Sequence, residues 1–404
     1  MAVKLTIPEK IHAVQGVQVG TACAGIKQTE RDDIALICFD EGTAVVGVYT
    51  QSHFAAAPVL IAKENESTSS GWIINSGNAN AATGYRGEVD ARKTCGIVGD
   101  RLSRPESSIQ PFSTGVIGEF LPMDKVESAI DEAVASLDPG SWESAARAIM
   151  TTDTQPKIVS SQFYLDDQLI TLTGIAKGSG MIRPDMATML AFMASDIAID
   201  RTLLKDLIKE ISEMSFNRIT VDGDTSTNDC FMLAFTGTAE MSPIIDKSDS
   251  RYAEILKILG EGAKALAQSI VRDGEGATKF VGVVVEGGAS EKECLSVAYS
   301  IAESPLVKTA LFAGDPNWGR FCMAIGKAPI EDVDTSLIEL WLDDVLVASG
   351  GMLSDSYNEI DGARVLGKEE FSVRIGLGRG SFSTEIWTTD LSYDYVKINA
   401  EYRT

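Results

Sequence analysis

The sequence predicts a mixed α/β protein, either α/β or α+β, whose sheets are mixed or largely antiparallel. Three kinds of segment carry this prediction: short apolar runs bounded by turns, longer runs with one apolar helical face, and a strand-rich tail. The chain has 404 residues, more than one ordinary core accommodates, so two domains are expected. We place a larger domain over 1–285 and a smaller α/β domain over 286–404.

Strands and turns dominate the start of the chain. Residues 34–40 (IALICFD) and 44–50 (AVVGVYT) are apolar runs separated by Glu-Gly-Thr, which predicts a β-hairpin. Residues 71–75 (GWIIN) form a further expected strand. Helices are expected around 88–102 and over 122–137, where the second begins with proline and is followed by Asp-Pro-Gly.

The second half of the chain alternates between the two kinds of element. Residues 161–178 read as two strands around an Asp-Asp turn. Apolar residues recur at helical spacing over 202–215 and again over 252–271. A buried strand is expected over 279–288, and a helix around 306–312. Three strand-like runs then fill the tail: IELWLDDVLVAS, FSVRIGLG and SFSTEIWTTDLS.

Composition excludes several classes of protein. The net charge of −23 argues against DNA, RNA or anionic lipid as a partner, because these require clustered Lys and Arg. No apolar run is long enough to span a bilayer, and the N-terminal residues lack a signal sequence. None of the six cysteines forms a C-x-x-C pair, so buried thiols are expected. These features predict a cytoplasmic protein.

The small number of histidines constrains the chemistry. Only His12 and His53 are present, and no motif surrounds either of them. A histidine-based triad or a multi-histidine metal site is therefore disfavoured, and no zinc-ligand spacing occurs. A nucleophile in this protein needs a base other than histidine.

Four glycine-rich or acidic segments are candidates for ligand sites. Residues 177–183 (KGSGMIR) and 376–382 (GLGRGSF) lack the pattern of a phosphate-binding loop, so turns or backbone close to a ligand explain them better. Residues 222–229 (DGDTSTND) do not fit the EF-hand spacing and favour hydrogen-bonded turns, with a share in an active site left open. Residues 113–119 (STGVIGE) fit a tight turn, although a Thr-Gly pair can also hold an oxyanion.

One threonine stands in an otherwise apolar run. Thr188 lies within residues 186–193 (MATMLAFM), just after a glycine-rich approach and a proline. A satisfied core threonine is the ordinary interpretation. The alternative is cleavage of the preceding bond, after which the α-amino group of Thr188, with a reference pKa of ~7.7–8.0, could activate its own hydroxyl.

Motifs throughout the chain resemble one family. The segment GSGMIRPDMATML is similar to the self-cleavage segment of the ornithine acetyltransferase family, the glutamate N-acetyltransferases of arginine biosynthesis. Further blocks resemble the family in the same order and cover nearly the whole chain: NSGNANAATG, STGVIGE, MTTDT, DGDTSTND, DGEGATKF, GDPNWGR and INAEYRT.

The resemblance implies a self-processing enzyme. The bond between Ala187 and Thr188 would be cleaved to give an α chain (1–187) and a β chain (188–404). Thr188 would then be the nucleophile that takes the acetyl group from N²-acetylornithine and passes it to L-glutamate, in ping-pong fashion. Similarity assigns the oxyanion hole to Thr114 and Gly115. It assigns substrate contacts to Thr151, Lys177, Thr188, Glu275, Asn399 and Thr404.

The resemblance also implies a fold and an assembly. The fold would be a layered αββα sandwich, as in the aminopeptidase and ornithine acetyltransferase group, with a smaller C-terminal α/β domain. Two α and two β chains would form a heterotetramer. No metal or prosthetic group is implied, and acetyl-CoA is a co-substrate only if the enzyme is bifunctional. Contacts from Asn399 and Thr404 require the C-terminal tail to fold back over the site.

Three positions depart from the family pattern. Arg183 and Asp185 stand where many relatives carry a small or uncharged residue and an asparagine, and Ala82 replaces a common cysteine. Arg183 and Asp185 lie close to the scissile bond in the sequence, so they could alter the rate of self-cleavage. Two other functions stay open: a self-processed amidase or aminopeptidase of the same fold, and an uncleaved binding protein without activity.

Overall fold

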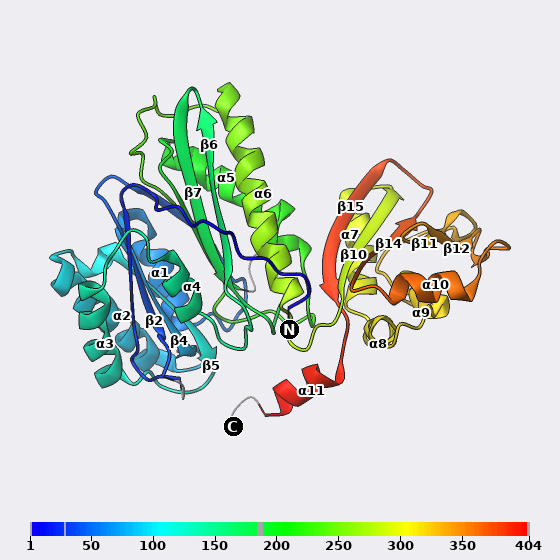
Figure 1. The fold of residues 1–404 in the computed structure, drawn as a ribbon, viewed down its shortest axis with the longest axis horizontal. Coiled ribbons are helices and arrows are strands. Elements are labelled where there is room, and N and C mark those ends of the chain that lie inside the picture. Colours follow the sequence, from blue (N-terminus) through cyan, green and yellow to red (C-terminus); the bar gives the residue numbers. More distant parts are fainter. Residues whose placement is uncertain (1, 28–29, 184–188, 402–404) are drawn as a thin grey trace.

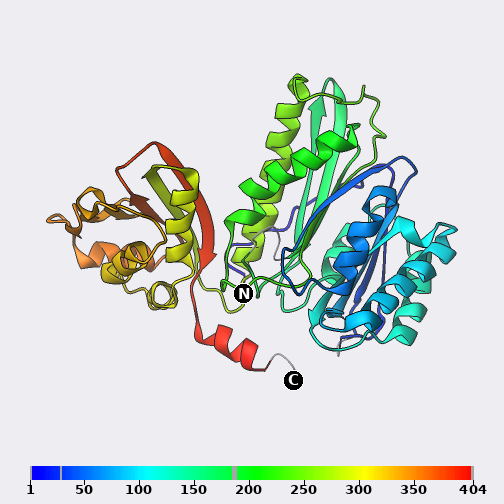
Figure 2. The same cartoon turned by 180° about the vertical axis from the view of Figure 1, so that it is seen from behind.

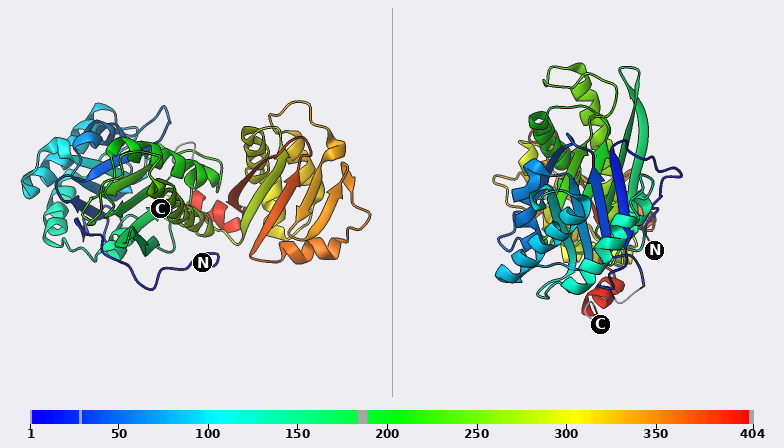
Figure 3. Two further views of the ribbon diagram at one scale, coloured as in Figure 1. Left: turned by 90° about the horizontal axis from the view of Figure 1, so that it is seen from above. Right: turned by 90° about the vertical axis from the view of Figure 1, so that its left-hand side faces the viewer.

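The fold is built from three β-sheets and the helices that cover them. A computed structural model describes residues 2–27, 30–183 and 189–401. Figure 1 shows two facing sheets in one body and a third sheet beside it, and Figure 2 shows the same arrangement from behind. Seen from above, the third sheet and its helices form a separate unit at one end of the molecule (Figure 3).

The first sheet has four strands in the order β1-β2-β4-β5. Its strands are β1 (Val17–Ala22), β2 (Ile34–Phe39), β4 (Gly71–Asn78) and β5 (Ile109–Val116). The pair β4 and β5 is parallel, whereas the other two pairs are antiparallel.

The second sheet has five strands in the order β3-β9-β8-β7-β6. Its strands are β3 (Ala44–Tyr49), β6 (Lys157–Leu165), β7 (Gln168–Lys177), β8 (Leu190–Ser195) and β9 (Cys230–Phe235). Only β8 and β9 are parallel.

Alternating burial shows how the two sheets stack. In β8, Phe192 packs into the core between the sheets, whereas its neighbour Met193 packs into the core beneath the helices of the second sheet. In β2, Ile37 faces the inter-sheet core and Leu36 faces the helices of the first sheet. Successive strand residues point to opposite faces, so each sheet buries both faces. The predicted layered αββα sandwich is confirmed.

Amphipathic helices form the outer layers. The helices α2 and α3 pack on the outside of the first sheet, and α5 and α6 pack on the outside of the second. The helices of this body are α1 (Ala57–Asn65), α2 (Gly84–Leu102), α3 (Met123–Ala135), α4 (Trp142–Ala148), α5 (Arg201–Met214) and α6 (Ser250–Arg272). The side chains of Asp200 and Asp249 cap α5 and α6, which explains where these helices begin.

The third sheet has six strands in the order β13-β12-β11-β14-β10-β15. Its strands are β10 (Phe280–Gly288), β11 (Glu339–Leu342), β12 (Val345–Ser349), β13 (Met352–Leu353), β14 (Glu370–Gly376) and β15 (Phe382–Thr389). The associated helices are α7 (Glu291–Ala302), α8 (Pro305–Ala313), α9 (Trp318–Gly326), α10 (Glu359–Leu366) and α11 (Tyr393–Ala400). This unit has its own apolar core. We retain a boundary near residue 285 as a proposal.

Most predicted elements are found, and all three sheets contain antiparallel pairs, as expected. The hairpin predicted over 34–40 and 44–50 is wrong, because β2 and β3 belong to different sheets. A turn is present, since Thr43 donates from its amide to the Asp40 carbonyl at 3.3 Å. It leads the chain from one sheet to the facing one. The local sequence signals a turn but does not specify the partner of either strand.

All six cysteines are free thiols, and four of them are buried. In the described part of the chain, no helix is both long and apolar enough to cross a bilayer.

Candidate active site

A cavity of about 270 Å³ opens where the first sheet meets the second. It lies at the end of β5 and beside the connection from β7 to β8. Its lining combines polar side chains with a few apolar ones: Ala79, Thr114, Gly115, Val116, Ile117, Thr151, Thr152, Lys177, Gly180, Met181, Ile182, Met189, Leu190, Ser226, Thr227, Asn228, Asp229, Glu275 and Asn399.

The end of β5 brings a hydroxyl and an unusual glycine to the cavity. Thr114 is buried, and Gly115 has a φ of +134°, a conformation that side chains other than glycine rarely adopt. A Cβ atom at Gly115 would also overlap the backbone of Gly77 in the neighbouring strand β4. The site therefore requires glycine for two independent reasons.

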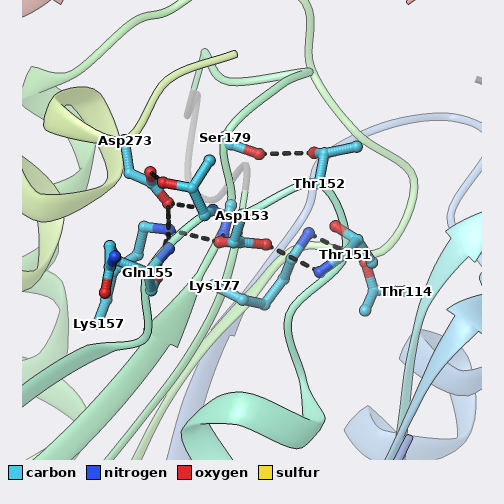
Figure 4. Close-up of polar contacts among 11 residues, drawn as sticks. Thr114, Thr151, Thr152, Asp153, Gln155, Lys157, Lys177, Ser179 and Asp273 are labelled. Atoms are coloured by element: carbon cyan, nitrogen blue, oxygen red, sulfur yellow. Dashed lines mark hydrogen bonds and ion pairs between the residues drawn. The ribbon is translucent and has the colours of Figure 1, made fainter. Parts of the chain in front are cut away.

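Lys177, the last residue of β7, supplies a buried cation. Its Nζ donates a hydrogen bond to the Thr114 Oγ1 at 3.2 Å, from one sheet to the other (Figure 4). Burial lowers the pKa of Lys177, whereas the nearby carboxylate of Asp153 opposes that change. A cation in this position can hold a substrate carboxylate.

The Asp153 carboxylate is bound by the backbone beside both Thr151 and Lys177. Its Oδ2 accepts from the Thr151 amide at 2.9 Å, and its Oδ1 accepts from the Gly178 amide at 2.7 Å. The Lys157 Nζ donates to the same Oδ1 at 2.5 Å. Burial alone would raise the pKa of Asp153, but the ammonium groups of Lys157 and Lys177 hold it below its ordinary value.

A second carboxylate completes this buried network. Asp273 accepts from the Lys157 Nζ at 2.6 Å, from the Thr154 amide at 2.9 Å and from the Gln155 amide at 3.2 Å. The Thr154 hydroxyl donates to it as well. Figure 4 shows Lys157 between the two carboxylates. The network ties the segment after α4 to the end of α6.

The acidic loop, residues 222–229, anchors the connection from β7 to β8. The Asp222 carboxylate accepts from the Met181 amide at 2.7 Å and from the Ile182 amide at 2.9 Å. It also accepts from the Asp224 amide at 3.2 Å and the Tyr395 hydroxyl at 3.3 Å. The expected hydrogen-bonded turn is confirmed, and it reaches both the β7–β8 connection and α11.

The C-terminal helix α11 brings an amide to the cavity. The Asn399 Nδ2 donates to the Glu275 Oε2 at 2.7 Å. Glu275 is buried and lies in the turn between α6 and β10, where its amide donates to the Ser179 carbonyl at 2.8 Å. Gly180 packs so closely against the Glu275 carboxylate that a side chain there would collide with it.

Residues before β9 close the cavity on another side. Asn228 bridges to the first sheet, because its Nδ2 donates to the carbonyls of Ala79 at 2.6 Å and Ser113 at 2.9 Å. Burial raises the pKa of Asp229 well above its ordinary value, and the hydrogen bond from Ser226 only partly offsets this.

The described residues assigned by resemblance lie together. Thr114, Gly115, Thr151, Lys177, Glu275 and Asn399 all line this one cavity. Ala187, Thr188, Asp185 and Thr404 lie outside the described residues. Met189, which follows Thr188 in the chain, lines the cavity.

Arg183 and Ala82, which also depart from the family pattern, both lie outside the cavity lining. Arg183 forms an ion pair with Glu303 at 2.6 Å, and its guanidinium lies over the Tyr299 ring. Ala82 has a φ of +56°, in the turn after β4. Neither residue lines the cavity.

Several residues near the cavity have no role that the sequence predicts. Asp153 and Asp273 belong to the quoted blocks MTTDT and DGEGATKF, and these charged positions within family blocks were the available signal. Lys157 carried only a weak signal, as a lysine at the start of a strand. Neither His12 nor His53 lines the cavity. Within the described ranges, no group of three or more His, Cys, Asp or Glu side chains is placed to hold a metal ion.

Comparisons with known proteins point to one family. The profile of the ArgJ family matches residues 18–404. Proteins named arginine biosynthesis bifunctional protein ArgJ, from Pseudomonas syringae pv. tomato and Pseudomonas fluorescens, are each 49% identical over 405 residues, covering 100% of both chains. A solved structure of the protein of that name from Bacillus halodurans is 36% identical, with a TM-score of 0.49, covering 51% of this chain and 95% of its own.

Ornithine acetyltransferase from Mycobacterium tuberculosis, solved with ornithine, is 32% identical over 44% of this chain and 94% of its own, with a TM-score of 0.38.

Proposed function

This chain belongs to the ArgJ family, and we propose that its Thr188 carries an acetyl group from N²-acetyl-L-ornithine to L-glutamate. The chain is an enzyme of arginine biosynthesis, a glutamate N-acetyltransferase. One observation carries the assignment of residues: six side chains or backbone positions that resemble the family's site line one cavity together with Met189, the neighbour of Thr188.

Self-cleavage is the first proposed step. The Thr188 hydroxyl attacks the carbonyl carbon of Ala187, and the Thr188 nitrogen leaves that carbon and takes up a proton. Water then hydrolyses the resulting ester. The products are residues 1–187, ending in a carboxylate, and residues 188–404, beginning with a free α-amino group. That amino group is the base that a protein with only two histidines otherwise lacks.

Acetyl transfer follows in two half-reactions. The Thr188 hydroxyl attacks the acetyl carbonyl of N²-acetylornithine, and its proton passes through the α-amino group to the departing ornithine amine. The glutamate amine then attacks the acetyl ester, which releases N-acetylglutamate and returns the proton to the Thr188 oxygen. Both steps pass through a tetrahedral oxyanion, for which the Thr114 hydroxyl and the Gly115 amide are the proposed donors.

The proposed substrate contacts fit the charges of an amino acid. Lys177 offers a buried cation for the α-carboxylate, and Glu275 offers an anion for an ammonium group. Thr151 and Asn399 supply further polar contacts, and Asn399 also orients Glu275. Thr188 itself and the terminal Thr404 complete the proposed set.

Three further features are proposed for the working enzyme. Acetyl-CoA serves as a second acetyl donor, as the word bifunctional in the names of the relatives suggests, and no resident cofactor is required. Two α and two β chains assemble as a heterotetramer. The enzyme acts in the cytoplasm, where its free thiols stay reduced.

A transfer assay tests the central proposal. N-acetylglutamate should form from N²-acetylornithine only when glutamate is present, with the parallel double-reciprocal plots of a ping-pong reaction. Release of free acetate at the full rate without glutamate would instead identify an amidase. Formation of N-acetylglutamate from acetyl-CoA and glutamate, measured separately, tests the bifunctional assignment.

Variants at Thr188 identify the nucleophile. Thr188→Ala should abolish both cleavage and transfer, whereas Thr188→Ser keeps a hydroxyl and should retain part of each. A Thr188→Ala protein that still processed normally would rule out the assigned nucleophile, and an uncleaved, inactive wild-type protein would favour a binding role.

A further inference from the structure

One buried carboxylate supports two sides of the cavity. Asp153 accepts hydrogen bonds from the amides of Thr151 and Gly178, and Gly178 directly follows Lys177 (Figure 4). The side chain of Asp153 is 0% exposed, so these bonds do not compete with water. A single rigid group therefore fixes the backbone that carries both Thr151 and Lys177.

Lys157 holds that carboxylate in place. Its ammonium group donates to Asp153 at 2.5 Å, to Asp273 at 2.6 Å and to the Gln155 carbonyl at 3.3 Å, which uses all three of its N–H groups. Lys157 and Asp273 are also 0% exposed. Removing one partner from such a network leaves a buried charge uncompensated, so the arrangement is strongly constrained.

The two buried carboxylates carry one more charge than Lys157 offsets. Asp153 and Asp273 contribute two negative charges, and Lys157 offsets one of them. The Lys177 ammonium, which acts on Asp153 through its charge, offsets the other. The network is thus coupled electrostatically to the cation that faces the cavity.

We propose that Asp153 is a positioning residue for acetyl transfer, holding the backbone of Thr151 and Gly178, and through Gly178 the neighbouring Lys177, in place. The inference rests on the substrate contacts proposed above for Thr151 and Lys177. Asp153 itself does not line the cavity, so its effect on substrate passes through its two neighbours.

Asp153→Asn is the direct test. An amide keeps one acceptor oxygen but turns an N–H group toward a former donor, so either Thr151 or Gly178 loses its partner. The KM for glutamate should rise about tenfold or more, with a smaller change in kcat. The alkaline limb of kcat/KM should also move to lower pH, because Lys177 loses the first of the charges that keep it protonated.

Lys157→Met should move the alkaline limb of kcat/KM in the opposite direction. The Lys157 charge lowers the pKa of Lys177, so its removal should move the alkaline limb to higher pH. General destabilisation cannot produce opposite shifts in two variants. The charged groups that act on Lys177 and stay unchanged in both comparisons are Asp229, Glu275 and Lys27. Substrate groups titrate identically in every comparison, so the difference from wild type reports the protein.

Two more variants separate positioning from stability. Asp153→Glu keeps a negative charge at position 153, so the alkaline limb of kcat/KM should lie near its wild-type position. Asp273→Asn should lower the melting temperature but raise the KM less than Asp153→Asn does, because Asp273 bonds to Lys157, Thr154 and Gln155 and reaches Thr151 and Gly178 only through Lys157 and Asp153. If Asp153→Asn does not fold, Asp153→Glu decides the question, because its longer side chain keeps the charge but displaces the acceptor oxygens of the Thr151 and Gly178 amides, so the KM for glutamate should still rise.

The outcomes distinguish this inference from the proposed function. A wild-type protein without transfer activity would overturn the proposed function. An active wild type, with an unchanged KM for glutamate and an unmoved alkaline limb in folded Asp153→Asn, would overturn only the positioning role. Mass spectrometry should confirm equal cleavage of all variants, so that the rates refer to the same processed species.

Discussion

The Lys177 ammonium and the Thr114 hydroxyl meet at 3.2 Å, each carried by a different sheet of the sandwich. This contact joins the proposed carboxylate-binding cation to the proposed oxyanion donor. Because both side chains are buried, their relative position is set by the packing of the two sheets. The stacking of the αββα layers is therefore what assembles the site.

Removing the Thr114 hydroxyl should impair chemistry more than stability. Thr114→Val keeps the shape of the side chain and removes the donor, so kcat should fall about 10²- to 10³-fold. The matched control is Thr173→Val in β7, where a buried hydroxyl donates to the His12 carbonyl at 2.7 Å and the residue does not line the cavity. Its loss should cost about 1 kcal/mol of folding free energy and leave kcat unchanged. Equal kcat values for both variants would contradict the role of Thr114.

Gly115 should tolerate no side chain. Gly115→Ala combines a φ of +134° with overlap against the Gly77 backbone, so both the melting temperature and kcat should fall. Gly118→Ala is the control, because Gly118 has a φ of +86° but open space around its Cβ position. The control should show only the conformational cost of about 1–2 kcal/mol. Thermal denaturation of both variants distinguishes the two contributions, and equal losses would show that the overlap is relieved.

Asp222 should influence self-cleavage. Asp222→Ala removes the acceptor of the Met181 and Ile182 amides, shortly before the proposed scissile bond, so the connection loses its fixed path. Cleavage should be slower, as followed by the fraction of intact chain in a time course. Asp224→Ala is the control, since Asp224 lies in the same loop and bonds to Asp222 through its backbone amide. Wild-type cleavage rates in Asp222→Ala would refute this role.

A buried lysine in the third-sheet unit should make stability depend on pH. Burial lowers the pKa of Lys308 from 10.5 to about 8, although its ammonium group donates to the Thr388 hydroxyl at 3.2 Å and to the Thr389 carbonyl. Between these two pKa values the unfolded chain binds more protons than the folded chain, so stability from this group rises with pH. The maximum contribution is about 3 kcal/mol.

Comparison with Lys308→Met isolates this effect from other titrating groups. The difference in unfolding free energy between wild type and variant should change in favour of wild type as the pH rises from about 8 to 10. Urea denaturation at several pH values measures it. A difference that is constant across this range would show that Lys308 titrates at its ordinary pKa.

Local patterns in the sequence predict where helices and strands lie better than they predict which strands pair. The helices α5 and α6 follow directly from apolar residues at helical spacing, because one face of each packs on the second sheet. The strands β2 and β3 were recognised, but their assignment to different sheets depends on contacts made far along the chain. A turn signal between two strands cannot encode that choice.

In the candidate site, too, local patterns do not reveal contacts between residues that are distant in the chain. Residue patterns alone gave only an unusual threonine, a Thr-Gly pair and an acidic loop, and the resemblance supplied the rest. Asp153 and Asp273 could not be paired in advance, because Lys157 connects two segments separated by more than a hundred residues. Their importance depends on burial, which periodicity does not reveal for a charged residue.

The most direct test is intact mass spectrometry of the purified protein, denatured after brief incubation with N²-acetylornithine. We predict two chains, residues 1–187 and residues 188–404, with one acetyl group on the second chain that disappears when glutamate is added. An undivided 404-residue chain, or an acetyl group that maps away from Thr188, would contradict the account.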